Sequence, residues 1–270
     1  MLINGQVSDV IAADDRGLQF GDGIFETMTW ENGGILHWRH HTKRIEKSLK
    51  ALLIEPVKRQ LLKQEIAQAV SESGLNKAVV KCILTRGRGG RGYGAVIDGT
   101  PQRVISVHPF PDLSAHREGI AIGVSKVQIA HQPMLAGMKH LSRLEYVMAK
   151  QDCLQQGYFE CVLCDVQQQV VEATTSNVFA IKGRTLVTPA IEQAGVAGVA
   201  REVLIGVANR LNYKVDVVKN LAFSSLGEYD ELFLSNAVMG YVPVARCGDI
   251  EFSSVQKGQY FYDLWHNHSI

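Results

Sequence analysis

The chain has 270 residues, of which 46% are hydrophobic and 20% are charged, and its formal net charge is +1. These values are typical of a globular protein with a substantial core, and the length suits two packed domains. A chain so close to neutrality has no bulk field that would recruit nucleic acid, a membrane surface or an acidic partner. The N-terminus lacks a signal peptide, and no run of about 18 apolar residues occurs, so we expect a cytoplasmic protein.

The five cysteines are scattered and odd in number, which is typical of reduced thiols in a core. Cys161 and Cys164 form a CxxC pair, but the surrounding segment 159–165 has the composition of a strand. The two thiols would then point to opposite faces, and no second pair completes a zinc site. We therefore predict no metal site.

The first half of the chain mixes short strands, a Gly/Asp-rich loop and two amphipathic helices. In chain order we expect strands at 1–3 and 6–10, the loop at 14–23, a strand at 24–30, helices at 38–53 and 57–73, strands at 77–85 and 103–108, and between these last two an Arg/Gly loop at 86–94. Pro109, Pro111 and the polar run after them indicate an interdomain linker.

The second half continues the mixture without a regular βαβ repeat. We expect strands at 120–127, 159–165, 169–172, 177–181, 185–187, 214–218, 231–234 and 242–247, and helices at 142–156, 199–211 and 253–266. The predicted fold class is therefore mixed α/β (α+β). We expect a smaller N-terminal domain at 1–112, a linker at 113–119 and a larger C-terminal domain at 120–270.

Lys139 lies in the segment LAGMKHLSRLEYV at 135–147, after a small and flexible Ala-Gly pair. We expect a helix directly after it, with Ser142 as N-cap and Glu145 as its capping-box partner. A lysine ammonium on an apolar approach is partly desolvated, which lowers its pKa and frees the amine to act as base or nucleophile. The alternative is an ordinary surface lysine at a helix start.

A lysine that forms a Schiff base suggests pyridoxal phosphate, which also needs an acid for its pyridine nitrogen and an anion site for its phosphate. Glu172 is an acid between apolar strand segments, Arg44 follows a basic run on a predicted helix, and GVAGVAR at 195–201 is a Gly-rich approach to a helix start. Each has an alternative in isolation: a strand-end acid, a solvated helix charge and an ordinary turn.

Together these motifs resemble the fold type IV pyridoxal-phosphate enzymes, which include branched-chain and D-amino-acid aminotransferases and aminodeoxychorismate lyases. The resemblance covers essentially the whole chain: FGDGIFET at 20–27, HTKRI at 41–45, the lysine segment at 135–147, VVEATTSNVF at 170–179, GVAR at 198–201 and LSNAVMGYVPV at 234–244. It implies the two-domain architecture of the D-amino-acid aminotransferases, a homodimer, and pyridoxal phosphate as cofactor.

The resemblance also implies roles for individual residues. Lys139 would be the Schiff-base lysine and proton-transfer base, and Glu172 the partner of the pyridine nitrogen. Thr27 matches an active-site hydroxyl. The remaining matches are to cofactor-binding positions, chiefly around the phosphate: Arg44, Asn177, Val199, Ala200, Asn236 and Ala237. Aminotransferases often carry threonine where this chain has the two alanines, so the phosphate would meet only backbone donors there.

The loop TRGRGGRGY at 85–93 separates the subfamilies, because it is similar to the RGxGGRGY signature of the lyases. Arg91 and Tyr93, with Arg86 as a weaker candidate, would contact a dianionic substrate. The implied reaction converts 4-amino-4-deoxychorismate to 4-aminobenzoate and pyruvate, a step of folate biosynthesis. The alternatives are an aminotransferase for branched-chain or D-amino acids and, from another class, an RNA-binding protein that uses the Arg/Gly loop.

Overall fold

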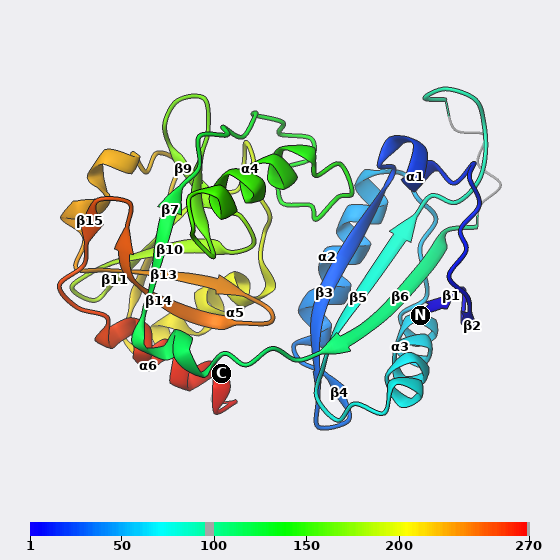
Figure 1. Ribbon diagram of the computed structural model, residues 1–270, viewed down its shortest axis with the longest axis horizontal. Coiled ribbons are helices and arrows are strands. Elements are labelled where there is room, and N and C mark those ends of the chain that lie inside the picture. Colours follow the sequence, from blue (N-terminus) through cyan, green and yellow to red (C-terminus); the bar gives the residue numbers. More distant parts are fainter. Residues whose placement is uncertain (95–99, 269–270) are drawn as a thin grey trace. The chain divides into compact units, whose positions relative to one another are not determined.

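The computed structural model describes residues 1–94 and 100–268, and the chain divides into two compact units (Figure 1). The first unit comprises Met1–Pro111 and a short later segment, Met138–Ser142. The second unit comprises Asp112–Gly137 and Arg143–Ile270. Lys139 therefore groups with the first unit, although its position in the sequence suggested the C-terminal domain.

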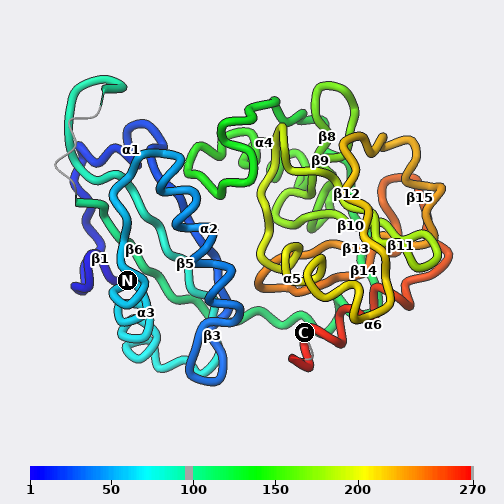
Figure 2. The backbone as a smooth tube through the Cα atoms, turned by 180° about the vertical axis from the view of Figure 1, so that it is seen from behind, coloured from blue at the N-terminus to red at the C-terminus, as the bar shows by residue number. Residues whose placement is uncertain are grey.

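Within the described residues, the first unit contains an antiparallel sheet of six strands in the order β2-β1-β6-β5-β3-β4. The strands are β1 (Leu2–Ile3), β2 (Gln6–Val7), β3 (Gly23–Glu31), β4 (Gly34–Ile35), β5 (Ala78–Thr85) and β6 (Gln102–Pro109). Helices α2 (Trp38–Ala51) and α3 (Arg59–Ser73) cover one face of this sheet, as Figure 2 shows from behind.

The alternation of side chains along β3 explains this layer. Ile24 and Met28 are buried and pack in one core with Ile45 of α2 and Ile66 of α3. Because successive strand residues point to opposite faces, Phe25 and its alternate neighbours project from the face that the helices leave uncovered.

The loop expected at 14–23 contains a short helix that the sequence did not indicate, α1 (Arg16–Phe20). The Asp15 carboxylate caps it by accepting from the backbone N–H groups of Gly17 and Leu18. Gly21 ends it in the left-handed conformation, with φ of 65°. A five-residue helix carries too little periodicity to be predicted.

The second unit contains a mixed sheet of nine strands among the described residues, in the order β12-β11-β10-β13-β14-β7-β8-β9, with β15 beside β14. The strands are β7 (Ile120–Val124), β8 (Cys161–Cys164), β9 (Val170–Ala173), β10 (Asn177–Lys182), β11 (Thr185–Pro189), β12 (Lys214–Val218), β13 (Glu231–Asn236), β14 (Gly240–Cys247) and β15 (Ile250–Glu251). Helices α5 (Val199–Val207) and α6 (Gln256–His266) pack on one face through aromatic side chains such as Phe233 and Tyr241. The predicted mixed α/β class is confirmed.

The segment 113–119, expected to be a linker, packs within the second unit. It contains a short 3₁₀ helix, Ser114–Glu118. Arg117 pairs with Asp263 of α6 at 2.8 Å, and the hydroxyl of Tyr262 donates to the Leu113 carbonyl at 2.9 Å. These contacts tie the segment to α6.

The predicted helix start after Lys139 is wrong by two residues. Helix α4 spans Leu144–Gln155, its N-cap is Arg143, and no side chain caps it. Ser142 instead ends the extended segment that groups with the first unit. The backbone of this segment pairs with a strand, and that pairing delays the helix.

All five cysteines are free and buried. Cys164 packs in the core that includes Val162 and Cys247, whereas Cys161 contacts Cys153 of α4, so the CxxC thiols do point to opposite faces of β8. Among residues 1–94 and 100–268, no group of three or more His, Cys, Asp or Glu side chains is placed to hold a metal ion. The same residues include no helix with the length and hydropathy of a membrane span.

Candidate active site

Lys139 is held by strand pairing to β3. Its carbonyl accepts from the backbone N–H of Phe25 at 2.8 Å, and the N–H of Leu141 donates to the Gly23 carbonyl at 2.9 Å. The Lys139 Nζ lies 4.5 Å from the centroid of the Phe25 ring, a cation–π distance, and the Nζ of Lys81 lies 5.5 Å from the same centroid. Thr27 is two residues along β3 from Phe25, half-buried and directly opposite Lys81 in the register.

The opposite face of β3 carries a buried charge cluster. Glu26 is 2% exposed, and its carboxylate accepts two hydrogen bonds from Arg44, at 2.8 Å from Nε and 2.6 Å from Nη2. The Nδ1 of His41 lies 2.6 Å from Glu26 Oε2. Arg44 and His41 project from α2 one turn apart, so the helix presents both to one carboxylate.

The charge states of Glu26 and His41 follow from their burial and from their neighbours. Burial alone would raise the pKa of Glu26, but the interactions with Arg44 and His41 together outweigh burial and lower the pKa to about 2. Burial lowers the pKa of His41 below its ordinary value. A neutral His41 then donates through Nδ1 to an ionised Glu26, and Arg44 is fixed in orientation by a bidentate ion pair.

In the second unit, the Glu172 carboxylate is 3% exposed and is held by hydrogen-bond donors on both oxygens. The hydroxyl of Tyr146 donates to Oε1 at 2.5 Å. The backbone N–H of Val196 donates to Oε2 at 3.0 Å, and the side-chain amide of Asn177 donates to it at 3.1 Å. Buried carboxylates need such partners, and this one lies at the end of β9 beside the turn that leads to α5.

The glycines of that turn allow the close packing. A Cβ at Gly198 would lie 1.9 Å from the Asn177 Oδ1, and a Cβ at Gly195 would lie 3.4 Å from the Glu172 Cδ. Gly195 also has φ of 87°, which a side chain rarely tolerates. The Gly-rich approach therefore lets the turn lie directly over Glu172 and Asn177.

The start of α5 and the turn after β13 hold the four other candidate cofactor residues. Gly198 is the N-cap of α5, and Val199 and Ala200 are therefore the first helical residues. No side chain caps this helix start. At the other turn, the Asn236 Oδ1 accepts from the backbone N–H groups of Val238 and Met239, at 2.9 and 2.7 Å. Asn236 thus shapes its own turn, which includes Ala237.

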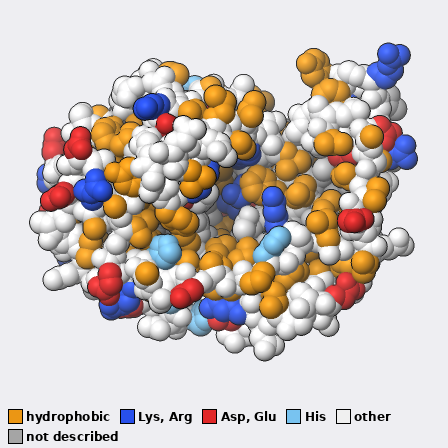
Figure 3. Space-filling view, viewed as in Figure 1, with side chains coloured by type: hydrophobic (Ala, Val, Ile, Leu, Met, Phe, Trp, Pro, Cys, Tyr) orange, Lys and Arg blue, Asp and Glu red, His pale blue; other side chains and the backbone are white. Residues whose placement is uncertain are grey.

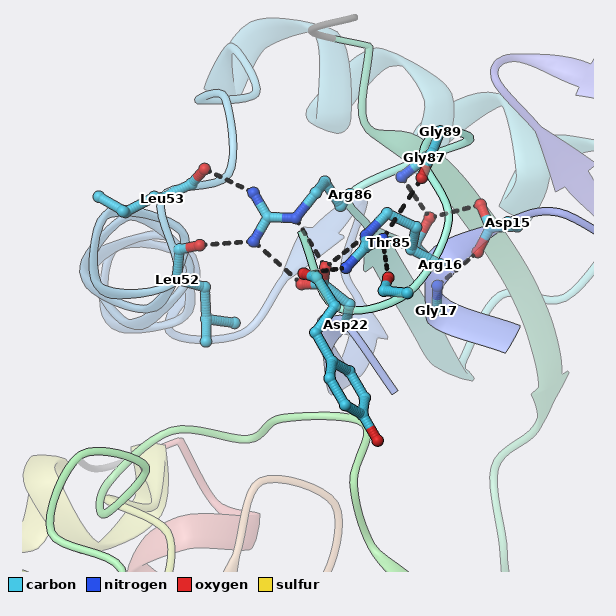
Figure 4. A network of polar contacts seen from close by, with 12 residues as sticks. Asp15, Arg16, Gly17, Asp22, Leu52, Leu53, Thr85, Arg86, Gly87 and Gly89 are labelled. Atoms are coloured by element: carbon cyan, nitrogen blue, oxygen red, sulfur yellow. Dashed lines mark hydrogen bonds and ion pairs between the residues drawn. The ribbon is translucent and has the colours of Figure 1, made fainter. Parts of the chain in front are cut away.

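Figure 4 shows that Arg86 is engaged inside the first unit. Its guanidinium bonds both oxygens of Asp22, at 2.7 and 3.0 Å, and donates to the carbonyls of Leu52 and Leu53 after α2, at 2.6 and 2.7 Å. Four bonds to neighbouring groups favour a structural role for Arg86. This separates it from the other two candidates for substrate contact.

Arg91 and Tyr93 are both exposed, and Tyr93 is 89% exposed. Their loop folds around Arg16, which is itself buried and donates to the carbonyls of Gly89, Gly92 and Tyr93 at 3.0–3.3 Å. Arg88, by contrast, pairs with the exposed Asp14. The side chains of Arg91 and Tyr93 are therefore exposed on a loop whose backbone carbonyls are bonded by Arg16.

Sequence reasoning missed four residues of these clusters: Glu26, Arg16, Asp22 and Tyr146. Glu26 had a usable signal, because an acid between Ile24 and Met28 on the core face of a strand needs a buried cation. Tyr146 had none, since its partner lies 26 residues away and on another element.

Residues 23–247 match the family described as Amino-transferase class IV. The chain belongs to this family. Among class IV relatives, it is 32% identical to an aminodeoxychorismate lyase of Vibrio harveyi over 90% of this chain and 89% of that protein. It is 28% identical to a putative branched-chain-amino-acid aminotransferase of Methanocaldococcus jannaschii, over 95% and 91%.

A solved class IV structure gives the same result for the fold. The 4-amino-4-deoxychorismate lyase of Pseudomonas aeruginosa superposes with a TM-score of 0.91 at 31% identity, covering 98% of both chains. The predicted resemblance to the fold type IV enzymes is confirmed, and the lyase and the aminotransferases both remain within it.

Proposed function

We propose that the protein is a pyridoxal-phosphate-dependent lyase that converts 4-amino-4-deoxychorismate to 4-aminobenzoate and pyruvate, a supply step for folate. The observation that carries the cofactor assignment is the buried Glu172 carboxylate at the end of β9, beside the turn into α5. The observation that favours the lyase over an aminotransferase is the loop TRGRGGRGY, together with the relatives at 31–32% identity.

The residues present fit this cofactor. Glu172 is an acid held in place by donors, which suits a pyridine nitrogen. The first N–H groups of α5 have no acceptor within the helix and no capping side chain, which suits a phosphate. Gly198 leaves room for Asn177 beneath that helix start. Val199, Ala200, Asn236 and Ala237 would contribute backbone donors, and Arg44 a charge oriented by Glu26.

Pyridoxal phosphate, when bound, supplies a ring that stores the electron pair left behind when a proton leaves the substrate. Lys139 would hold the cofactor covalently through its side-chain amine. Once the substrate amine takes the place of Lys139, the freed Lys139 amine would take the proton from the carbon that bears the substrate nitrogen. Glu172 keeps a proton on the pyridine nitrogen throughout. The C–O bond to the enolpyruvyl group then breaks, the enolpyruvate takes up a proton and leaves as pyruvate, and the remaining ring becomes aromatic.

We assign substrate contact to the sheet face of the first unit that α2 and α3 leave uncovered and to the Arg/Gly loop of that unit. Arg91 offers a planar guanidinium to a carboxylate of the dianionic substrate, and Tyr93 offers a hydroxyl. Thr27 offers a second hydroxyl on the same face of β3 as Phe25, the ring that Lys139 covers. The five free cysteines suit a cytoplasmic location, which is part of this proposal.

The proposal predicts lyase activity well above transamination. Purified protein loaded with cofactor receives aminodeoxychorismate in one assay, and D-alanine or a branched-chain amino acid with a 2-oxoacid in the other. We expect release of 4-aminobenzoate and pyruvate in equal amounts, with kcat/KM at least about 100-fold above that for amino-group exchange. Efficient exchange without 4-aminobenzoate would instead assign the chain to the aminotransferases.

We include a homodimer in the proposal, and the exposed apolar face of α4 supports it. Leu144, Val147 and Met148 are 53–72% exposed and lie on one face of the helix at the spacing i, i+3, i+4. On the face that Figure 3 draws, acidic and basic side chains are scattered among apolar ones. A contiguous apolar helix face is the kind of surface that a second subunit covers.

If the protein dimerises through this face of α4, introducing charged side chains there should lower the mass of the particle in solution. Leu144→Glu with Met148→Glu should convert a dimer to a monomer of 29.8 kDa, measured by light scattering on a sizing column. Val217→Glu, at an apolar residue of β12 that is 50% exposed, serves as the control and should leave the mass unchanged. A wild-type protein that is already monomeric at micromolar concentration would contradict the dimer.

A further inference from the structure

Tyr146 joins two environments within the second unit. Its ring lies against the apolar cluster that includes Ile129, Leu163 and Val171, and the Arg143 guanidinium lies 4.6 Å from the ring centroid. Its hydroxyl reaches the Glu172 Oε1 at 2.5 Å, the shortest of the three contacts described for that carboxylate. The packing therefore fixes the position of the ring, and the Tyr146 hydroxyl donates to Oε1 of Glu172.

The hydroxyl is a donor at every working pH. Burial and then the charge of Glu172 raise the pKa of Tyr146 well above its ordinary value, so the phenol keeps its proton. A hydrogen bond to the charged form of an acid favours that form, and a short O–H···O⁻ bond does so strongly. Tyr146 thus stabilises Glu172 as a carboxylate rather than as a neutral acid.

We propose that Tyr146 is a positioning residue that fixes the Glu172 carboxylate and keeps it ionised opposite the pyridine nitrogen. This rests on the proposed function, since it assigns to Glu172 the pyridine partner role. Without the phenol, the proton shared by Glu172 and the ring nitrogen moves toward Glu172, and the bound ring becomes a weaker electron acceptor. Tyr146 acts only through Glu172, so its effect should depend on the charge there.

The test is a double-mutant cycle of Tyr146→Phe and Glu172→Gln, with Tyr158→Phe as the matched control. Tyr158 follows the same helix and interacts through its hydroxyl with Arg246 at 3.2 Å. Three quantities are measured for each variant: the affinity of the apoprotein for pyridoxal phosphate by absorbance titration, kcat and KM for aminodeoxychorismate, and the melting temperature of the apoprotein.

For Tyr146→Phe we expect cofactor affinity and kcat each to fall about tenfold, with KM changed less than about twofold, because a hydrogen bond to a charged group is lost. In the Glu172→Gln background, Tyr146→Phe should lower cofactor affinity and kcat by less than half as much, measured as the logarithm of the fold-change. Tyr158→Phe should leave cofactor affinity and kcat unchanged.

Equal effects of Tyr146→Phe in both backgrounds, or none in the wild type, would overturn the positioning role. A drop in apoprotein melting temperature with unchanged kcat in the loaded fraction would also overturn it, because the tyrosine would then be structural. A wild-type protein that binds the cofactor but releases no 4-aminobenzoate would refute the proposed reaction instead, while the affinity cycle would still report on Tyr146.

Discussion

Lys139→Ala should abolish turnover of aminodeoxychorismate, with a loss of about 10,000-fold or more, since both covalent attachment and the proton-transfer base disappear. The fold should survive, because the segment pairs with β3 through its backbone: the Lys139 carbonyl accepts from Phe25, and Leu141 donates to Gly23. The measurements are product release, the visible absorption of the reconstituted protein and the apoprotein melting temperature.

Lys77→Ala is the matched control for that variant. Lys77 also lies over an aromatic ring, with its Nζ 4.4 Å from the Phe110 centroid, and it pairs with Glu31 at 2.9 Å. Removing it deletes the same side chain from the same unit, and turnover should be unchanged. Normal turnover by Lys139→Ala would refute the assignment of the covalent lysine.

Glu172→Gln should retain the cofactor but lower kcat by about 100-fold, since a charged group is lost at the point where electron density accumulates. The amide is nearly isosteric, and its single oxygen can still accept either from Tyr146 or from Val196 and Asn177, so part of the hydrogen bonding around it should persist. Stopped-flow absorbance separates cofactor binding from proton removal. An unchanged rate of proton removal would show that the ring nitrogen has another partner.

Glu231→Gln controls for the loss of a buried carboxylate as such. Glu231 is 1% exposed and accepts from the backbone N–H groups of Lys257 and Gly258 at the start of α6, at 2.9 and 3.0 Å. Its substitution should lower stability by about 1–3 kcal/mol through weakened bonds to a charged group. The kcat of the folded fraction should not change.

Local patterns were enough to predict most elements and the fold class. β3 was predicted from alternation, α2 from its apolar face, and the turn into α5 from its glycines, because these signals lie within a few residues of one another. The family resemblance rested on motifs of the same short range. It covered the chain because the motifs occur in order from residue 20 to residue 244.

The features that the sequence did not reveal depend on long-range contacts. The start of α4 was displaced because residues 139–141 pair with residues 23–25, more than 100 positions away. Arg86 was predicted to contact substrate, but the carbonyls after α2 and the Asp22 carboxylate engage its guanidinium. The Tyr146–Glu172 bond joins a helix to a strand. None of these pairings has a periodicity that a sequence can display.

The most direct test of the account is the chemical location of the cofactor. The protein is reconstituted with pyridoxal phosphate, reduced with sodium borohydride to make the attachment permanent, digested and analysed by peptide mass spectrometry. The account predicts one phosphopyridoxyl group per chain, on the peptide that contains Lys139. A label on another lysine, such as Lys81, or no label on protein that binds the cofactor, would contradict it.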